Sequence, residues 1–121
     1  MLVVEDDADA RRLINLVLSF AGAQTFVVDR VAKALEAIDS FKPNILLSDI
    51  GMPEQDGFDL IREVRGRGYT FQQLPAVVLT AFARTEDRRR ALLAGFQAYA
   101  SKPVDPTELT ATIATLVGRT G

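Results

Sequence analysis

Polar residues that could do chemistry follow short apolar runs at four places in the chain. They are Glu5, Asp6 and Asp7 after residues 2–4, Ser48 and Asp49 after 45–47, Thr80 after 76–79, and Ser101 and Lys102 after 97–100. Carboxylates brought together repel one another, and at ~4 Å with an effective dielectric near 20 each pair costs about 4 kcal/mol. A cation relieves that repulsion, and ligands that are all oxygen favour a hard ion, Mg²⁺ or Ca²⁺.

Together with a lysine and a hydroxyl, such a carboxylate cluster fits a site that accepts a phosphoryl group. Mg²⁺ takes few protein carboxylates and fills its shell with waters and a phosphate oxygen. Lys102 offers a positive charge for an anionic oxygen, and Thr80 offers a hydroxyl donor. One of the carboxylates can serve as a nucleophile, because aspartyl phosphate is a known covalent species. Catalysis of such a transfer comes mostly from positioning and charge neutralisation.

Five apolar runs separated by segments of helical period must position these residues. The runs are 2–4, 25–28, 45–47, 76–79 and 97–100, and their near-continuous apolarity is typical of buried parallel strands. In the first helical segment one face is shared by Leu13, Leu16, Val17 and Phe20. The alternation predicts one doubly wound α/β domain over residues 1–121, with a five-stranded parallel sheet and five helices on two faces. Ligands bind at the carboxyl ends of such strands, so the polar residues should meet at one edge.

The composition excludes several classes of function. The chain has no His and no Cys, so a Ser-His-Asp triad, a thiolate nucleophile and a Cys-based zinc site are ruled out. A net charge of −2 gives no general attraction to nucleic acid or an anionic membrane. No apolar run approaches the ~20 residues of a membrane span, and the start of the chain lacks a signal-peptide pattern. We therefore expect a cytoplasmic protein with no membrane partner and no direct contact with nucleic acid.

Five stretches of the chain resemble the receiver domain of two-component response regulators, in that family's order and spacing. They are Val3 to Asp7, Ser48 to Pro53, Asp56-Gly57, Leu79-Thr80-Ala81 and Lys102-Pro103. The resemblance covers essentially the whole chain and implies a flavodoxin-like receiver fold with strand order 2-1-3-4-5. It also implies a signalling phosphoprotein of a phosphorelay that catalyses its own phosphorylation and slow dephosphorylation, not a turnover enzyme.

The resemblance implies a role for each residue around the acceptor. Asp49 would take a phosphoryl group from the phosphohistidine of a sensor histidine kinase or a histidine phosphotransfer protein. Asp6, assisted by Glu5, would hold Mg²⁺ together with Asp49 and the backbone carbonyl of Gly51. Lys102 would pair with the phosphoryl group.

The resemblance further implies a readout of the phosphorylated state. Thr80 would bond a phosphoryl oxygen, and Tyr99 would change rotamer in step with it. The reporting surface would be the fourth helix, fifth strand and fifth helix, roughly residues 84–117, which fits a two-state switch biased by a local charge change. A downstream output domain or target protein would read this surface. A homodimer on phosphorylation and a larger parent protein are both left open.

Some residues depart from the family's pattern, and other functions stay open at this point. Glu5 stands where many members have Asp, and Gly51 and Phe82 occupy positions that tune the lifetime of the acyl phosphate. A Mg²⁺-dependent phosphatase would need an Asp at residue 51, and a flavin-binding protein would need a phosphate cradle where Glu5 begins an acidic run. A pseudo-receiver that only binds a partner is a further alternative. The basic run from Arg84 to Arg90 is interleaved with acidic residues, which favours a solvated helix face over nucleic-acid binding.

Overall fold

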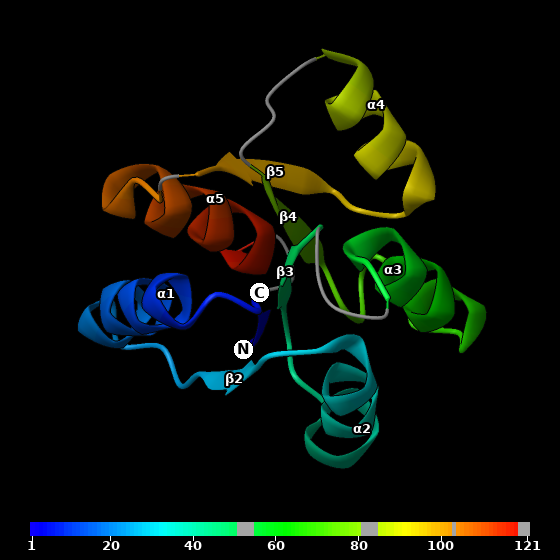
Figure 1. Cartoon of the computed structure of the whole chain (residues 1–121), viewed down its shortest axis with the longest axis horizontal. Helices are drawn as coiled ribbons and strands as arrows, with labels where there is room; N and C mark the ends of the chain where they lie inside the picture. Colours follow the sequence, from blue (N-terminus) through cyan, green and yellow to red (C-terminus); the bar gives the residue numbers. More distant parts are fainter. Residues whose placement is uncertain (51–54, 81–84, 103, 119–121) are drawn as a thin grey trace.

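Strands and helices alternate along the whole described chain. The structure, a computed structural model, describes residues 1–50, 55–80, 85–102 and 104–118, of which residues 85, 87, 101, 117 and 118 are described by their backbone alone. The strands are β1 (Leu2–Val4), β2 (Phe26–Val28), β3 (Leu46–Asp49), β4 (Ala76–Thr80) and β5 (Ala98–Ser101). The helices are α1 (Ala8–Phe20), α2 (Val31–Phe41), α3 (Gly57–Gly66), α4 (Thr85–Ala94) and α5 (Pro106–Gly118). All five apolar runs thus became strands, as predicted (Figure 1).

The five strands form one parallel sheet in the order β2-β1-β3-β4-β5. This confirms the fold class and the strand order expected from the sequence. The register pairs Val4 with Ser48 and Asp49 with Leu79. Residues that follow β1 and β3 therefore leave the sheet side by side, and every strand delivers its next residue to the same edge.

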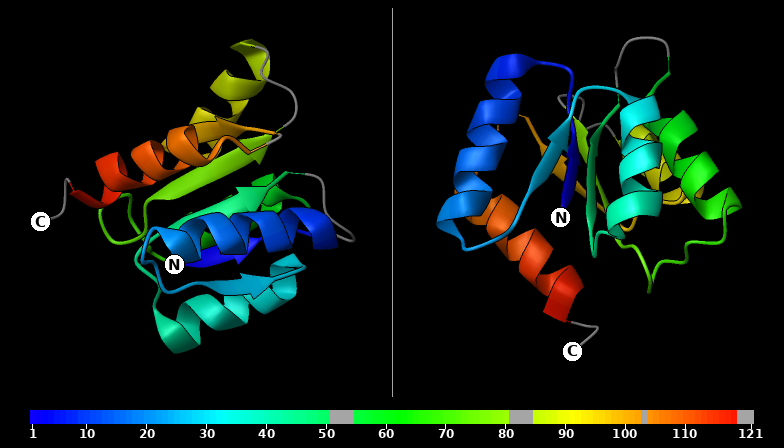
Figure 2. Two further views of the ribbon diagram at one scale, coloured as in Figure 1. Left: turned by 90° about the vertical axis from the view of Figure 1, so that its left-hand side faces the viewer. Right: turned by 90° about the horizontal axis from the view of Figure 1, so that it is seen from below.

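Helices cover both faces of the sheet (Figures 1 and 2). Helices α1 and α5 lie on one face, where a core cluster joins Val3, Ile14, Leu18, Leu47, Leu79, Leu109 and Ile113. Helices α2, α3 and α4 lie on the other, around a second cluster that includes Val4, Ile38, Leu46, Phe58, Ile61, Val78, Ala91 and Phe96. Side chains of each strand alternate between the two clusters, which explains why the strand sequences are apolar throughout. None of the described helices is long and apolar enough to cross a membrane.

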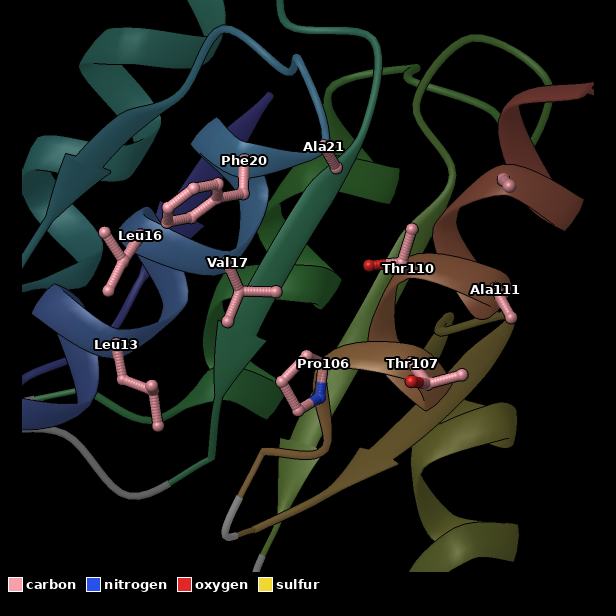
Figure 3. Close-up of a pocket in the computed structure, with 10 residues that line it drawn as sticks. Leu13, Leu16, Val17, Phe20, Ala21, Pro106, Thr107, Thr110 and Ala111 are labelled. Atoms are coloured by element: carbon pink, nitrogen blue, oxygen red, sulfur yellow. The ribbon is translucent and has the colours of Figure 1, made fainter.

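The apolar stripe expected on the first helix is not the face that α1 buries. Ile14 and Leu18, one helical turn apart, are buried against the sheet, whereas Leu16 and Phe20 are 56% and 85% exposed. The stripe instead lines a groove of about 770 Å³ between α1 and α5 (Figure 3). On the α5 side, the described side chains that line this groove are proline, threonine and alanine. The small side chains of α5 leave the large ones of α1 uncovered.

Aspartates begin three of the helices at the carboxyl edge of the sheet. Asp7 accepts a hydrogen bond from the Ala10 amide at 3.1 Å and caps α1. Asp56 caps α3 through a reciprocal capping box with Asp59. Asp105 accepts from two amides of the first turn of α5. These caps satisfy backbone donors that have no partner within the helix, so Asp7 stabilises the start of α1.

Candidate functional site

A buried carboxylate, Glu5, lies at the centre of the carboxyl edge. Its side chain is fully buried, and that of Asp49 on the neighbouring strand is only 13% exposed. The Lys102 Nζ donates to Glu5 Oε1 and lies 3.1 Å from Asp49 Oδ1. Lys102 leaves β5 and reaches these carboxylates beyond the end of β4. One ammonium group therefore pairs with two carboxylates.

The second oxygen of Glu5 has no such partner. Glu5 Oε2 is buried without a hydrogen-bond donor among the described residues. Burial, reinforced by the Asp49 carboxylate and opposed by Lys102, raises the pKa of Glu5 to about 7. Burial alone would lower the pKa of Lys102, but its hydrogen bonds to Glu5 and Asp49 leave that pKa raised. The cluster thus holds more negative charge than one lysine can neutralise.

Three of the predicted site residues could hold a metal ion. Glu5, Asp6 and Asp49 each offer a carboxylate oxygen, and these oxygens lie within 4.8 Å of one another. The donor set is all oxygen, which suits a hard divalent cation. The unpartnered Oε2 of Glu5 is a further reason to expect a cation here, because a buried unpaired carboxylate oxygen is costly. Gly51 lies outside the described residues, so its carbonyl ligand stays a prediction, as do the roles of Phe82 and Pro103.

Local backbone contacts fix the position of Asp49. Its Oδ1 accepts from the Ile50 amide at 2.8 Å, and its carbonyl accepts from the Ser48 hydroxyl at 2.8 Å. The Gly57 amide donates to the Ile50 carbonyl at 2.7 Å. The first turn of α3 is therefore bonded to the residue that follows Asp49. The Asp56-Gly57 pair, one of the stretches that carry the family resemblance, therefore also packs against the site.

Arg11 is a site residue that the sequence reasoning missed. Its Nη1 donates to the carbonyl of Glu5 and to the carbonyl of Asp6, both at 2.9 Å. These bonds tie α1 to the acidic segment and bring a positive charge beside it. The only sequence signal was a basic residue about one helical turn into the first helix, which is common on exposed helices.

Thr80 and Tyr99, the predicted readout residues, lie in different surroundings. Thr80 is the buried last residue of β4, and its carbonyl accepts from the Lys102 amide at 2.9 Å. Tyr99 on β5 pairs in register with Val78 and is half-buried in the cluster beneath α3 and α4. Thr80 is thus linked to the site through Lys102, whereas Tyr99 packs on the α3–α4 side of the sheet.

Comparisons with known proteins agree with this fold. The family model of the response regulator receiver domain matches residues 1–114. A 14.6 kDa protein encoded 3′ of sodA1 in Leptolyngbya boryana is 48% identical over 111 residues, covering 90% of this chain and 82% of that protein. Response regulator Rre1 of Synechocystis is 38% identical over 98% of this chain and 52% of its own length, so the chain spans about half of that regulator.

Solved structures of receiver domains also superpose on this fold. The crystal structure of the BeF₃-activated N-terminal receiver domain of Klebsiella pneumoniae RstA is 30% identical and superposes with a TM-score of 0.86 over 96% of each chain. The chain belongs to the response regulator receiver domain family.

Proposed function

We propose that this chain accepts a phosphoryl group on Asp49 from the phosphohistidine of a sensor histidine kinase or a histidine phosphotransfer protein. The observation that carries the proposal is the pairing of Lys102 with both Glu5 and Asp49 at the edge where Asp6 adds a third carboxylate. This arrangement supports the proposal, because the Asp49 carboxylate, the Lys102 ammonium and a possible metal-binding group lie within one small volume. We expect the reaction in the cytoplasm, in a phosphorelay of the two-component type.

The transfer is balanced by one bond formed and one bond broken. A carboxylate oxygen of Asp49 attacks phosphorus, a P–O bond forms, and the P–N bond to the donor imidazole breaks. The imidazole leaves with the electrons of the P–N bond and takes up a proton from water, so it departs as neutral imidazole. The ammonium of Lys102, already 3.1 Å from Asp49 Oδ1, would shift from the carboxylates to the anionic phosphoryl oxygens. Water later hydrolyses the acyl phosphate, which returns Asp49 and releases inorganic phosphate.

Glu5, Asp6 and Asp49 are the residues that would hold Mg²⁺, with the Gly51 carbonyl proposed as a further ligand. When bound, Mg²⁺ neutralises the charge on the transferring phosphoryl group. Arg11 keeps the acidic segment in place through the two carbonyls that it binds. Because burial already holds the Glu5 side chain in place, metal binding would cost little further side-chain entropy at this residue.

The readout is proposed to involve Thr80 and Tyr99. Asp49 pairs in register with Leu79, so Thr80, the next residue of β4, lies near the end of β3. Its hydroxyl would therefore follow a new anionic phosphoryl group on Asp49. Tyr99 on β5 would change rotamer with it and alter the surface of α4, β5 and α5. A two-state element of this kind converts a local charge into a change of binding surface for an output domain or target protein.

The direct test is intact mass after incubation with Mg²⁺ and a small acyl phosphate such as acetyl phosphate. The expected result is one added phosphoryl group that disappears in Asp49→Asn and when Mg²⁺ is chelated. Where hydrolysis is fast, beryllofluoride serves as a stable phosphoryl mimic, as in the activated RstA receiver domain. Wild-type protein that neither gains mass nor binds beryllofluoride in Mg²⁺ would contradict the proposal and favour a pseudo-receiver.

A further inference from the structure

Arg88 of α4 lies over the ring of Tyr99 on β5. The Arg88 guanidinium carbon lies 4.2 Å from the centroid of that ring. The Nε of Arg88 is buried and has no hydrogen-bond partner among the described residues. A guanidinium that gives up hydration at Nε without a polar acceptor depends on the ring face for its compensation. The contact therefore joins α4 to β5 at a point where part of the guanidinium is withdrawn from water.

We propose that Arg88 is a positioning residue that holds Tyr99 in the orientation seen here, so that the readout of Asp49 phosphorylation must break this contact. The inference rests on the proposed function, because it assigns a control to the rotamer of Tyr99. Face-on stacking depends on the orientation of the ring. A change of the χ1 rotamer, a rotation of about 120°, moves the ring away from the guanidinium. The contact therefore belongs to one of the two Tyr99 states and opposes the other.

The opposite end of α4 is attached in a different way. Arg65 of α3 donates to the Gly95 carbonyl through Nε at 3.1 Å and through Nη2 at 2.8 Å. A Cβ on Gly95 would lie 3.0 Å from Arg65 Cγ, so the Gly95 backbone and the Arg65 side chain are in close contact. Several directional hydrogen bonds thus fix the carboxyl end of α4 to α3. Arg90 of α4 also lies over the ring of Phe58 on α3, at 4.3 Å, whereas Arg88 joins α4 to β5. A change of the Tyr99 rotamer would therefore act on α4 through Arg88.

The energetic consequence has a definite sign. A contact present in only one of two states stabilises that state, and its removal lowers the free energy needed to reach the other. A cation–π contact of this kind corresponds to about a two- to fivefold change in an equilibrium constant. Removing the Arg88 cation should therefore tighten the binding of a phosphoryl mimic. A merely structural role for Arg88 would leave that affinity unchanged or weaken it.

A fluorine label can follow the proposed junction in solution. The chain contains two tyrosines, Tyr69 and Tyr99, so protein made with 3-fluorotyrosine gives two assignable ¹⁹F resonances, with Tyr69→Phe as the assignment control. Arg88→Gln should shift the Tyr99 resonance and leave that of Tyr69 in place. Arg89→Gln, which changes the exposed neighbouring arginine, should shift neither.

The decisive experiment is a beryllofluoride titration in saturating Mg²⁺, followed by the Tyr99 resonance. Arg88→Gln should bind about two- to fivefold more tightly than wild type, and Arg88→Lys should fall near wild type because an ammonium also binds a ring face. Arg88→Met, which fills similar space without charge, repeats the test if the Gln variant fails to fold. Equal or weaker binding by a folded Gln or Met variant overturns the inference. Wild-type protein that binds no beryllofluoride instead overturns the proposed function, and the shift of the Tyr99 resonance on Arg88→Gln still reports whether the contact exists.

Discussion

Gly57 lies so close to Asp49 that a side chain at residue 57 would collide with the acceptor's backbone. A Cβ built on Gly57 would be 2.3 Å from the Asp49 carbonyl oxygen and 3.1 Å from the Ile50 Cα. Both neighbours are backbone atoms, which cannot turn aside as a flexible side chain can. The glycine is therefore required by space, and the first turn of α3 sets the position of the acceptor.

Gly57→Ala should displace Asp49 and impair both stability and phosphorylation. Overpacking of this kind costs about 1–3 kcal/mol, and the shift should slow phosphorylation by acetyl phosphate. Gly66→Ala is the matched control, because a Cβ at the end of the same helix meets nothing within 4 Å. Urea unfolding and the rate of mass gain measure the two effects. Wild-type behaviour of Gly57→Ala would show that this close approach does not constrain the acceptor.

Arg11 should support metal binding without touching the metal. Arg11→Ala removes two charge-assisted bonds to the carbonyls of Glu5 and Asp6, so Mg²⁺ affinity should fall about fivefold or more. Arg12→Ala is the control, since Arg12 is exposed and its Nη1 lies 3.9 Å from Asp9 Oδ1. Isothermal titration with Mg²⁺ gives both affinities. The prediction fails if the two variants bind Mg²⁺ equally well.

Lys102 should stabilise the metal-free protein by compensating a buried charge. Lys102→Met leaves Glu5 with two unpartnered oxygens beside Asp49, and loss of one member of a buried pair costs about 3 kcal/mol. Adding Glu5→Gln to this variant should recover part of the loss, because the buried charge is then absent. Urea unfolding without Mg²⁺ supplies the double-mutant cycle. Strictly additive losses would mean that Lys102 and Glu5 are not coupled.

Glu5 should make the metal-free protein less stable as the pH rises towards neutrality. Its pKa is raised to about 7 in the folded state from an unfolded value of 4.5, so the folded state binds the proton more tightly. This contribution is fully present below the unfolded pKa and is lost as the pH rises through about 7. Glu5→Gln should remove the slope, which urea unfolding from about pH 5 to about pH 8 measures. The chain has no His, and the terminal amine is common to both proteins, so a slope unchanged by Glu5→Gln would refute the assignment.

The sequence was sufficient to predict how the sheet assembles the site. Residues that follow parallel strands must meet at one edge, and Glu5, Asp49 and Lys102 do so. The same reasoning did not by itself distinguish the roles of Asp6 and Asp7. Both are acidic and adjacent, but Asp7 caps α1 while Asp6 joins the metal-binding group. Which of two neighbouring carboxylates serves the helix depends on where the first turn begins.

Features that depend on packing between helices could not be predicted. Leu16 and Phe20 have the spacing of a buried stripe, but α5 presents only small residues to them, and no local pattern in α1 reveals this. Arg88 belongs to a charged run typical of a solvated face, and its stacking on Tyr99 depends on the angle at which α4 crosses β5. Periodicity gives the face of a helix, whereas tertiary contacts decide what that face meets.

Identifying the residue that carries the phosphoryl group tests the central proposal most directly. Protein treated with acetyl phosphate and Mg²⁺ is reduced with borohydride, which converts an aspartyl phosphate to homoserine, and the peptides are sequenced by mass spectrometry. We predict homoserine at residue 49 alone, with Asp6 and Asp7 unmodified. Homoserine at either of those residues with Asp49 intact, or a phosphoryl group on a serine or threonine, would contradict the assignment of Asp49 as the acceptor.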